Sequence, residues 1–119
     1  MENPNLTFLT STLLNGDRSG VAVLAHEIGH SWCGNLVGYK TNDHCWLNEG
    51  FTKFLERKLI EIHYGKPSSD LDAVEGIRLL DNFCNQVSGT KKELLSCMVW
   101  DLEGIDPDDA SSCIPCQSD

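Results

Sequence analysis

The spacing of hydrophobic positions changes along the chain and predicts a short strand followed by a helix. Residues 5–14, NLTFLTSTLL, are rich in Leu, Thr and Phe, which is typical of a strand, and the turn residues NGD end this segment. From Ser19, apolar residues recur every three or four positions as far as Trp32, in SGVAVLAHEIGHSW. This spacing predicts an amphipathic helix after the strand.

Two more helices are predicted after a loop at GYKTND. The first extends from about Leu47 to about His63, and the pair GK followed by Pro67 ends it. The stretch SSDLDAVEGIRLLDNF begins with capping residues and predicts a third helix that reaches about Val87. From Gly89 onward the pattern is irregular. The sequence therefore predicts an α+β fold that is mainly helical.

The composition is that of one globular domain with a negative charge. The 119 residues are enough for one core, and 40% of them are hydrophobic. No run approaches the roughly 18 apolar residues of a membrane helix, and MENPNLTFLT lacks the features of a secretory signal. The net charge of −9 disfavours nucleic acid and anionic membranes and favours cationic ligands, including metals and free amines. We therefore expect a cytoplasmic protein with no nucleic-acid partner and no membrane insertion.

Six cysteines are compatible with a disulfide framework, but the lack of a secretory signal favours free thiols. The pair in CIPC resembles half of a redox or zinc site, which is a weak indication without a second pair. The sequon NLT at Asn5 is equally uninformative without secretion. No function is therefore assigned to the cysteines, which are Cys33, Cys45, Cys84, Cys97, Cys113 and Cys116.

The segment HEIGH carries the strongest chemical signal. His26 and His30 are four residues apart, so on a helix both imidazoles lie on one face and can reach a single metal ion. Glu27 projects roughly 60° from His30 around the helix, so it lines the same cavity without crowding the ion. A carboxylate in this position can accept a proton from water that attacks a carbonyl and pass it to a leaving amine.

A third ligand is predicted in the following helix. Glu49, in WLNEGF, follows His30 after 18 intervening residues, which allows the two helices to pack together and bring its carboxylate to the ion. Two histidines and one glutamate form a known catalytic zinc set, which leaves the fourth position open. The alternative, two hydrogen-bonded helix histidines and a surface carboxylate, requires all these spacings to coincide by chance.

A ligating histidine needs an acceptor that fixes its tautomer. Glu56 lies seven residues after Glu49, two turns along the same helix face, and is the best candidate for this second-shell role. Asn48 and Asp43 are weaker candidates. Two further histidines fall outside the pattern and are interpreted as surface or loop residues; they are His44 and His63.

The segments MENP, HEIGHSWCGNLV and WLNEGF, in this order and spacing, resemble the gluzincin zinc aminopeptidases, whose hallmark is Gly-x-Met-Glu-Asn followed by HExxH-x18-E. NLTFLTSTLL, LNEGFTKFLER and IDPDDASS are most similar to the leukotriene A(4) hydrolase and aminopeptidase B branch. The resemblance implies a thermolysin-like catalytic subdomain, with an N-terminal strand segment and a zinc-binding helix pair. It further implies that residues 1–119 are a partial catalytic domain, without the β-rich and C-terminal helical domains that flank it in the family.

The same resemblance implies one zinc ion per chain and a peptide substrate with a free N-terminus. His26, His30 and Glu49 would be the zinc ligands and Glu27 the catalytic base. Two further residues would contact the substrate: Glu2 would bind its α-amine, and Asp108 would lie in its pocket. A carboxylate suits the first role because an exopeptidase must recognise a terminal ammonium group.

One departure from the family leaves alternative functions open. The family places a tyrosine that stabilises the tetrahedral intermediate where this chain has Cys116, and a thiol is only a weak hydrogen-bond donor. Losing such a donor costs about 100- to 1000-fold in rate. The first alternative is therefore a truncated chain that binds zinc with little or no catalysis. A lower-ranked alternative, which Asp108 leaves open, is an epoxide hydrolase similar to leukotriene A(4) hydrolase.

Overall fold

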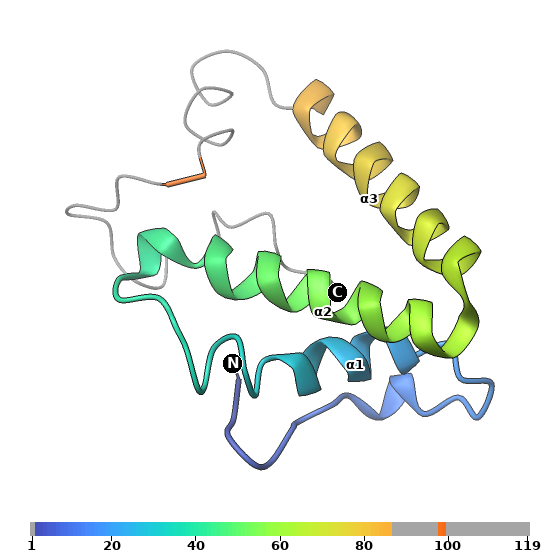
Figure 1. Ribbon diagram of the computed structural model, residues 1–119, viewed down its shortest axis with the longest axis horizontal. Helices are drawn as coiled ribbons and strands as arrows, with labels where there is room; N and C mark the ends of the chain where they lie inside the picture. The colour runs from blue at the N-terminus through green and yellow to red at the C-terminus, as the bar shows by residue number, and fades with distance from the viewer. Residues whose placement is uncertain (1, 87–97, 100–119) are drawn as a thin grey trace.

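The computed structural model describes residues 2–86 and 98–99, and these residues are mainly helical, as predicted (Figure 1). Two residues discussed above lie outside the described residues. They are Asp108, which the family resemblance places in the substrate pocket, and Cys116, which stands where the family has a tyrosine. The elements are a 3-10 helix at Ser11–Leu13, helix α1 at Val21–Gly29, a 3-10 helix at Asn42–His44, helix α2 at Trp46–Tyr64 and helix α3 at Lys66–Gln86.

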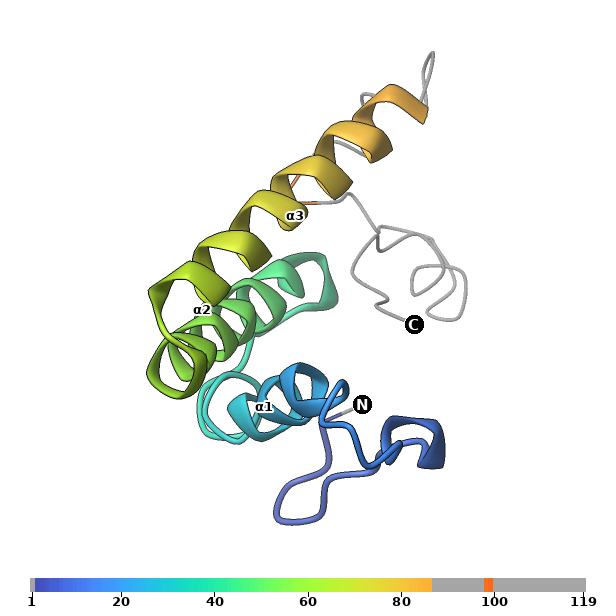
Figure 2. The same cartoon turned by 90° about the vertical axis from the view of Figure 1, so that its right-hand side faces the viewer.

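Helix α2 is the centre of the fold. It packs against α1 on one side and against α3 on the other. Figure 2 shows the three helices in this order, with α2 between its two neighbours. Side chains of α2 can therefore contact residues of both neighbouring helices.

Helices α1 and α2 approach closely where α1 ends. A Cβ atom added at Gly29 would lie 3.1 Å from Thr52 Cγ2, so any larger residue here would push against Thr52 and move it by a few tenths of an ångström. Regular helix ends at Gly29, before the predicted end at Trp32, because the next amides turn back to carbonyls three residues earlier, as in Ser31 N–H to Ile28 O at 3.0 Å. His30 keeps helical dihedral angles (φ −61°, ψ −18°), so the one-turn spacing from His26 is retained.

The change of direction between α2 and α3 depends on a single glycine. Gly65 has φ 87° and ψ 164°, a conformation that is essentially restricted to glycine. Helix α3 then begins at Lys66, slightly earlier than the predicted capping serines. Pro67 lies in its first turn, where a missing N–H removes no helical hydrogen bond. Gly65 rather than Pro67 therefore ends α2.

The predicted strand at residues 5–14 does not form among the described residues. The segment is irregular and closes into the 3-10 helix Ser11–Leu13, with the hydroxyl of Thr10 capping it. The composition of this segment favours extended backbone, but a strand also requires a neighbour with which to exchange hydrogen bonds. No segment in the described part of the chain pairs with it as a strand.

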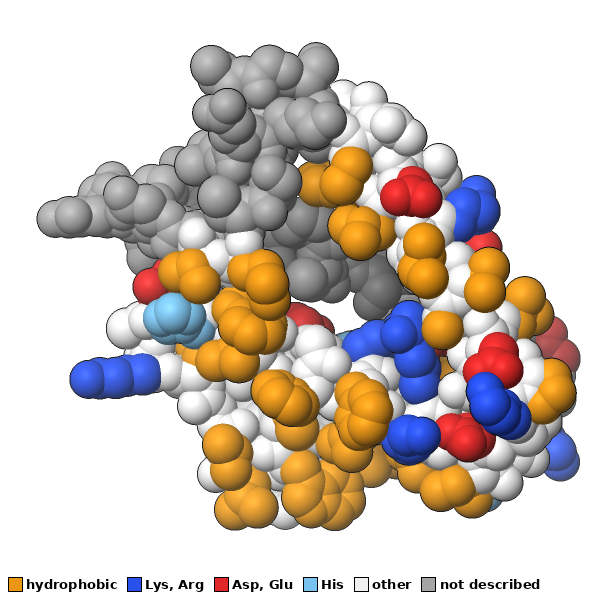
Figure 3. Space-filling view, turned by 45° about the horizontal axis from the view of Figure 1, so that its top comes forward, with side chains coloured by type: hydrophobic (Ala, Val, Ile, Leu, Met, Phe, Trp, Pro, Cys, Tyr) orange, Lys and Arg blue, Asp and Glu red, His pale blue; other side chains and the backbone are white. Residues whose placement is uncertain are grey.

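Among the described residues, polar side chains are buried and many apolar side chains are exposed, which is the reverse of an ordinary small domain. The buried polar side chains belong to His30, Asn48, Thr52 and Glu56, and Thr52 is fully buried. Many large hydrophobic side chains are exposed instead, including Phe51 on α2, and Figure 3 shows hydrophobic side chains gathered on one face of the molecule. Polar groups are normally buried only when they are paired, so this interior is organised around a polar network.

Within the described residues, no helix combines the length and the apolar character that a membrane span requires. Cys33, Cys45 and Cys84 carry thiols, as expected, and the other three cysteines lie outside the described residues.

Candidate metal centre

Three side chains from α1, its C-terminal end and the first turn of α2 converge in the polar interior. His26 Nε2 lies 3.1 Å from His30 Nε2 and 3.2 Å from Glu49 Oε2. The third side of this triangle, from His30 Nε2 to Glu49 Oε2, is 3.6 Å. These three residues form a group that could hold a metal ion.

The triangle fits a tetrahedral metal site. Donor atoms bound about 2.0–2.1 Å from a tetrahedral zinc ion lie about 3.3–3.4 Å from one another. The three observed separations, 3.1, 3.2 and 3.6 Å, bracket this value. Two imidazoles and one carboxylate are also the donor types that suit zinc. The residues present therefore fit the metal that the sequence predicts.

The two carboxylates beside His26 favour a positive charge on its ring. Hydrogen bonds to Glu49 and then to Glu56 raise the pKa of His26 from 6.5 to about 9, and burial only partly opposes them. Burial by itself raises the pKa of Glu49, but the hydrogen bond to His26 and the charges of both histidines outweigh it and hold that pKa below its usual value. The site is therefore built for a positive charge, which a metal ion would provide in place of the proton.

The second ring nitrogen of His26, Nδ1, contacts Glu56, which is the residue that the sequence predicts as the acceptor that fixes the histidine tautomer. His26 Nδ1 donates to Glu56 Oε2 at 3.1 Å, and the Glu56 side chain is only 4% exposed. This contact leaves Nε2 of the ring to face the other two donors. The weaker candidates have other partners: Asn48 Oδ1 accepts the Tyr39 N–H at 3.3 Å, and Asp43 lies 3.7 Å from His44 in the 3-10 helix Asn42–His44.

The second ring nitrogen of His30 has a different partner, which the sequence analysis did not identify. His30 Nδ1 donates to the carbonyl oxygen of Cys33 at 2.9 Å. The hydroxyl of Thr52 donates to the same oxygen at 3.2 Å and lies 3.1 Å from Nδ1. A contact with a backbone carbonyl cannot be predicted from residue types. The only indication for Thr52 is its position one turn after Asn48, on the buried face of α2.

The other two histidines, His44 and His63, which the sequence does not predict as ligands, lie outside the candidate metal centre. His44 Nε2 lies 3.7 Å from the carboxylate of Asp43, in the 3-10 helix before α2. His63 lines an apolar pocket of about 290 Å³ between α1 and α2, together with Leu24, Ile28 and Tyr64. Neither belongs to the group of donors that could hold a metal.

Glu27 and Glu2 are the two predicted carboxylates that do not join the triangle. Glu27 lies on α1 between the two histidines and is partly buried, and its carboxylate has no hydrogen-bond or ion-pair partner within the described part of the chain. Glu2 lies close enough to Tyr39 for its charge to act on the phenol: burial, the Cys45 thiol and the Glu2 carboxylate together raise the pKa of Tyr39. The charge of Glu49 also contributes to the raised pKa of Tyr39.

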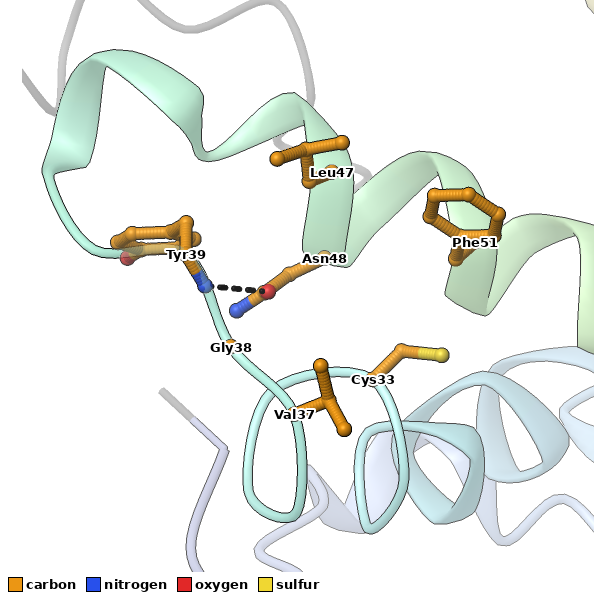
Figure 4. A pocket seen from close by; sticks show the side chains of 7 residues that line it. All are labelled: Cys33, Val37, Gly38, Tyr39, Leu47, Asn48 and Phe51. Atoms are coloured by element: carbon orange, nitrogen blue, oxygen red, sulfur yellow. Dashed lines mark hydrogen bonds between the residues drawn. The ribbon is translucent and has the colours of Figure 1, made fainter.

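A second apolar pocket, of about 310 Å³, lies on the Cys33 side of the interior (Figure 4). Figure 4 shows the amide of Asn48 pointing from α2 toward the Tyr39 backbone, where the hydrogen bond holds the loop beside the helix. Asn48 therefore orders the loop that follows α1 and contributes to the pocket rather than to the metal site. The lining residues are Cys33, Val37, Gly38, Tyr39, Leu47, Asn48 and Phe51.

Comparison with known proteins agrees with the family that the sequence resembles. The model of the peptidase family M1 domain matches residues 1–97. Leucine aminopeptidase 2-1 of Meyerozyma guilliermondii is 47% identical over 97% of this chain and 19% of its own length. Leucine aminopeptidase 2 of Sclerotinia sclerotiorum is 44% identical over the same shares, and a leukotriene A-4 hydrolase homolog of Botryotinia fuckeliana is 44% identical over 97% of this chain and 18% of its own.

The chain spans about a fifth of the length of these curated relatives. No solved structure matches it. The family match covers the whole metal centre and both helices that build it, and it confirms the family predicted from the sequence. The chain belongs to peptidase family M1.

Proposed function

We propose that this chain carries the zinc centre of an aminopeptidase with a thermolysin-like arrangement of the two zinc-binding helices. The observation that supports the proposal most directly is the triangle of His26 Nε2, His30 Nε2 and Glu49 Oε2, with sides of 3.1 to 3.6 Å. The names of the relatives as leucine aminopeptidases support peptide hydrolysis from the N-terminus as the reaction. One zinc ion per chain is expected.

A zinc ion held by these three residues would supply Lewis-acid activation of water and of a carbonyl group. Glu27 is assigned the proton transfers: its carboxylate accepts a proton from the attacking water and returns it to the leaving amine. The lack of a competing partner for Glu27 among the described residues supports this role, since a base must be free to accept the proton. Glu56 holds His26 through Nδ1 and keeps Nε2 directed at the metal.

The substrate is proposed to be a peptide with a free N-terminus. Glu2 is assigned the binding of the terminal ammonium group, and its influence on Tyr39, which also senses Glu49, supports a position near the metal ligands. A carboxylate at a fixed distance from the metal sets which peptide bond is cut, because it fixes the first residue of the substrate. Asp108 is assigned to the substrate pocket by resemblance alone. A cytoplasmic location belongs to the same proposal.

The test measures zinc content and turnover on the purified chain. We expect about one zinc per chain and chelator-sensitive release of leucine from a fluorogenic leucine amide. Glu27→Gln should retain zinc and lower turnover by about 100- to 10,000-fold. The matched control is Glu61→Gln on the exposed surface of α2, which should change neither quantity.

Three results would count against parts of the proposal. Unchanged turnover in Glu27→Gln would exclude Glu27 as the base. Stoichiometric zinc without turnover would favour the alternative of a chain that binds zinc but does not catalyse. Hydrolysis of a lipid epoxide without hydrolysis of the leucine amide would favour the epoxide hydrolase alternative over the aminopeptidase.

A further inference from the structure

We propose that Lys53 is a positioning residue of the metal centre, which fixes Glu56 against His26 and is itself held by Asp72 of helix α3. The inference rests on the zinc centre proposed above. It adds to that centre a line of contacts that starts outside the zinc-binding helix pair. Neither Lys53 nor Asp72 was identified from the sequence.

The two oxygens of Glu56 are held by different partners. Oε2 accepts from His26 Nδ1 at 3.1 Å, and Oε1 accepts from Lys53 Nζ at 2.6 Å. The Glu56 side chain is 4% exposed, so water cannot readily replace either contact. A carboxylate held at one oxygen can still rotate about its terminal bond, whereas one held at both oxygens has a single orientation. Lys53 therefore determines how Glu56 faces the imidazole.

Lys53 has a second anchor on a different helix. Its Nζ also donates to Asp72 Oδ1 at 3.2 Å, and Asp72 Oδ2 accepts from Arg57 Nε at 2.6 Å. Burial of Asp72 raises its pKa, but the hydrogen bonds to Arg57 and Lys53 outweigh this effect and keep the pKa below its usual value. The contacts therefore continue from α3 through α2 to α1, in the order Asp72, Lys53, Glu56 and His26.

Another pair on α2 shows what an ordinary surface contact looks like in the same helix. Lys58 and Glu61 have the same three-residue spacing and an Nζ–Oε2 distance of 2.9 Å, and their side chains are 55% and 37% exposed, against 41% for Lys53 and 4% for Glu56. Neither residue belongs to the donor group of the metal centre. Exposed pairs of this kind contribute little, roughly 0 to 1 kcal/mol. The two lysines thus form a matched pair, one with a buried partner that contacts His26 and one without.

The consequence is measurable in metal affinity. Removing the direct partner of a ligating histidine typically weakens metal binding by about 10- to 100-fold. Lys53 acts one contact further from the ion, so we expect Lys53→Met to weaken zinc binding by about 10-fold, the lower end of that range. Methionine keeps most of the aliphatic length of lysine, so the substitution removes mainly the ammonium group. Asp72→Asn should have a smaller effect in the same direction.

The experiment uses the whole chain and two readouts. Zinc affinity is measured by competition with a chelator of known affinity, for wild type, Lys53→Met, Lys53→Arg and the control Lys58→Met. Proton NMR of the metal-free chain follows the His26 Nδ1–H signal, which the hydrogen bond to Glu56 shifts downfield. Helical content by circular dichroism shows that each variant is folded. We expect both readouts to change in Lys53→Met, to recover in Lys53→Arg and to stay unchanged in Lys58→Met.

The possible results separate this inference from the proposed function. If wild type binds zinc and Lys53→Met binds it equally well with an unchanged ring-proton signal, Lys53 is not a positioning residue. Equal losses in Lys53→Met and Lys58→Met would also overturn the inference, because a general effect on α2 would explain them. If wild type binds no zinc, the zinc centre is wrong, and the ring-proton signal of the metal-free chain alone decides whether Lys53 positions Glu56.

Discussion

Raising the pH of the metal-free chain from about 6 to about 10 should destabilise it through His26. Folding raises the pKa of this imidazole from 6.5 to about 9, so the folded chain binds the proton more tightly than the unfolded chain. The resulting stability is fully present below about pH 6.5 and is lost as the pH rises through about 9. The direction is opposite to the one that a zinc-bound site would show, because metal binding requires a deprotonated ring.

The magnitude follows from the two pKa values. Their difference corresponds to about 3.4 kcal/mol at 25 °C, which is an upper limit. The side chains of His26 and Glu49 retain 17% and 20% of their exposure, so water screens part of the attraction. We expect roughly half of the limit, about 1.5–2 kcal/mol.

The assay is urea unfolding with a chelator present, followed by circular dichroism at several pH values, for wild type and His26→Gln. The quantity compared is the change in unfolding free energy with pH, so a constant cost of the substitution does not matter. Other groups that titrate at high pH, such as Tyr39, whose pKa burial raises, cancel in this comparison. Parallel pH profiles for the two proteins would refute the assigned role of His26 as the charged centre of the metal-free site.

Three further predictions concern stability, and urea unfolding measures each of them. Gly29→Val should lower the unfolding free energy by about 1–3 kcal/mol, because its side chain would press on Thr52 where α1 and α2 meet. Thr52→Val should lower it by about 1 kcal/mol by removing the hydroxyl bond to the Cys33 carbonyl, and an unchanged value would show that this bond contributes nothing. Gly65→Ala should lower the unfolding free energy by about 1–3 kcal/mol, because alanine is strained at φ 87°. Gly50→Ala, where the added methyl group would lie in open space within α2, should raise the unfolding free energy by about 0.5–1 kcal/mol. Effects of the same sign would contradict this account of the two glycines.

Local patterns in the sequence predicted the helices and brought the donor residues to notice. The spacing of His26 and His30 is a property of one helix turn, and Glu56 follows from its distance along the same helix as Glu49. The separation of the two helices depends on Gly29 and Thr52, which the hydrophobic pattern does not distinguish. Local pattern therefore identified the donors, and helix packing determined the distances between them.

The parts that could not be predicted depend on contacts between distant segments. The residues 5–14 have the composition of a strand, but strand formation depends on a partner that the local pattern cannot specify. Lys53 and Asp72 look like ordinary surface charges in the sequence, and only the crossing of α2 and α3 brings their side chains to 3.2 Å. The carbonyl of Cys33 is a backbone group, so no residue type could have indicated its contact with His30.

The position of the metal centre along the chain has a consequence for its assembly. The three donors and the side chains of Glu56 and Thr52 that contact the histidines all lie between residues 26 and 56, before α3 begins at Lys66. Contacts between segments this close in sequence form rapidly, and a chain folds from its N-terminus as it is synthesised. If the proposed zinc centre is correct, the helix pair is complete enough to bind the ion before α3 is synthesised. Asp72 arrives last, so α3 would secure a metal site that is already assembled rather than help to create it.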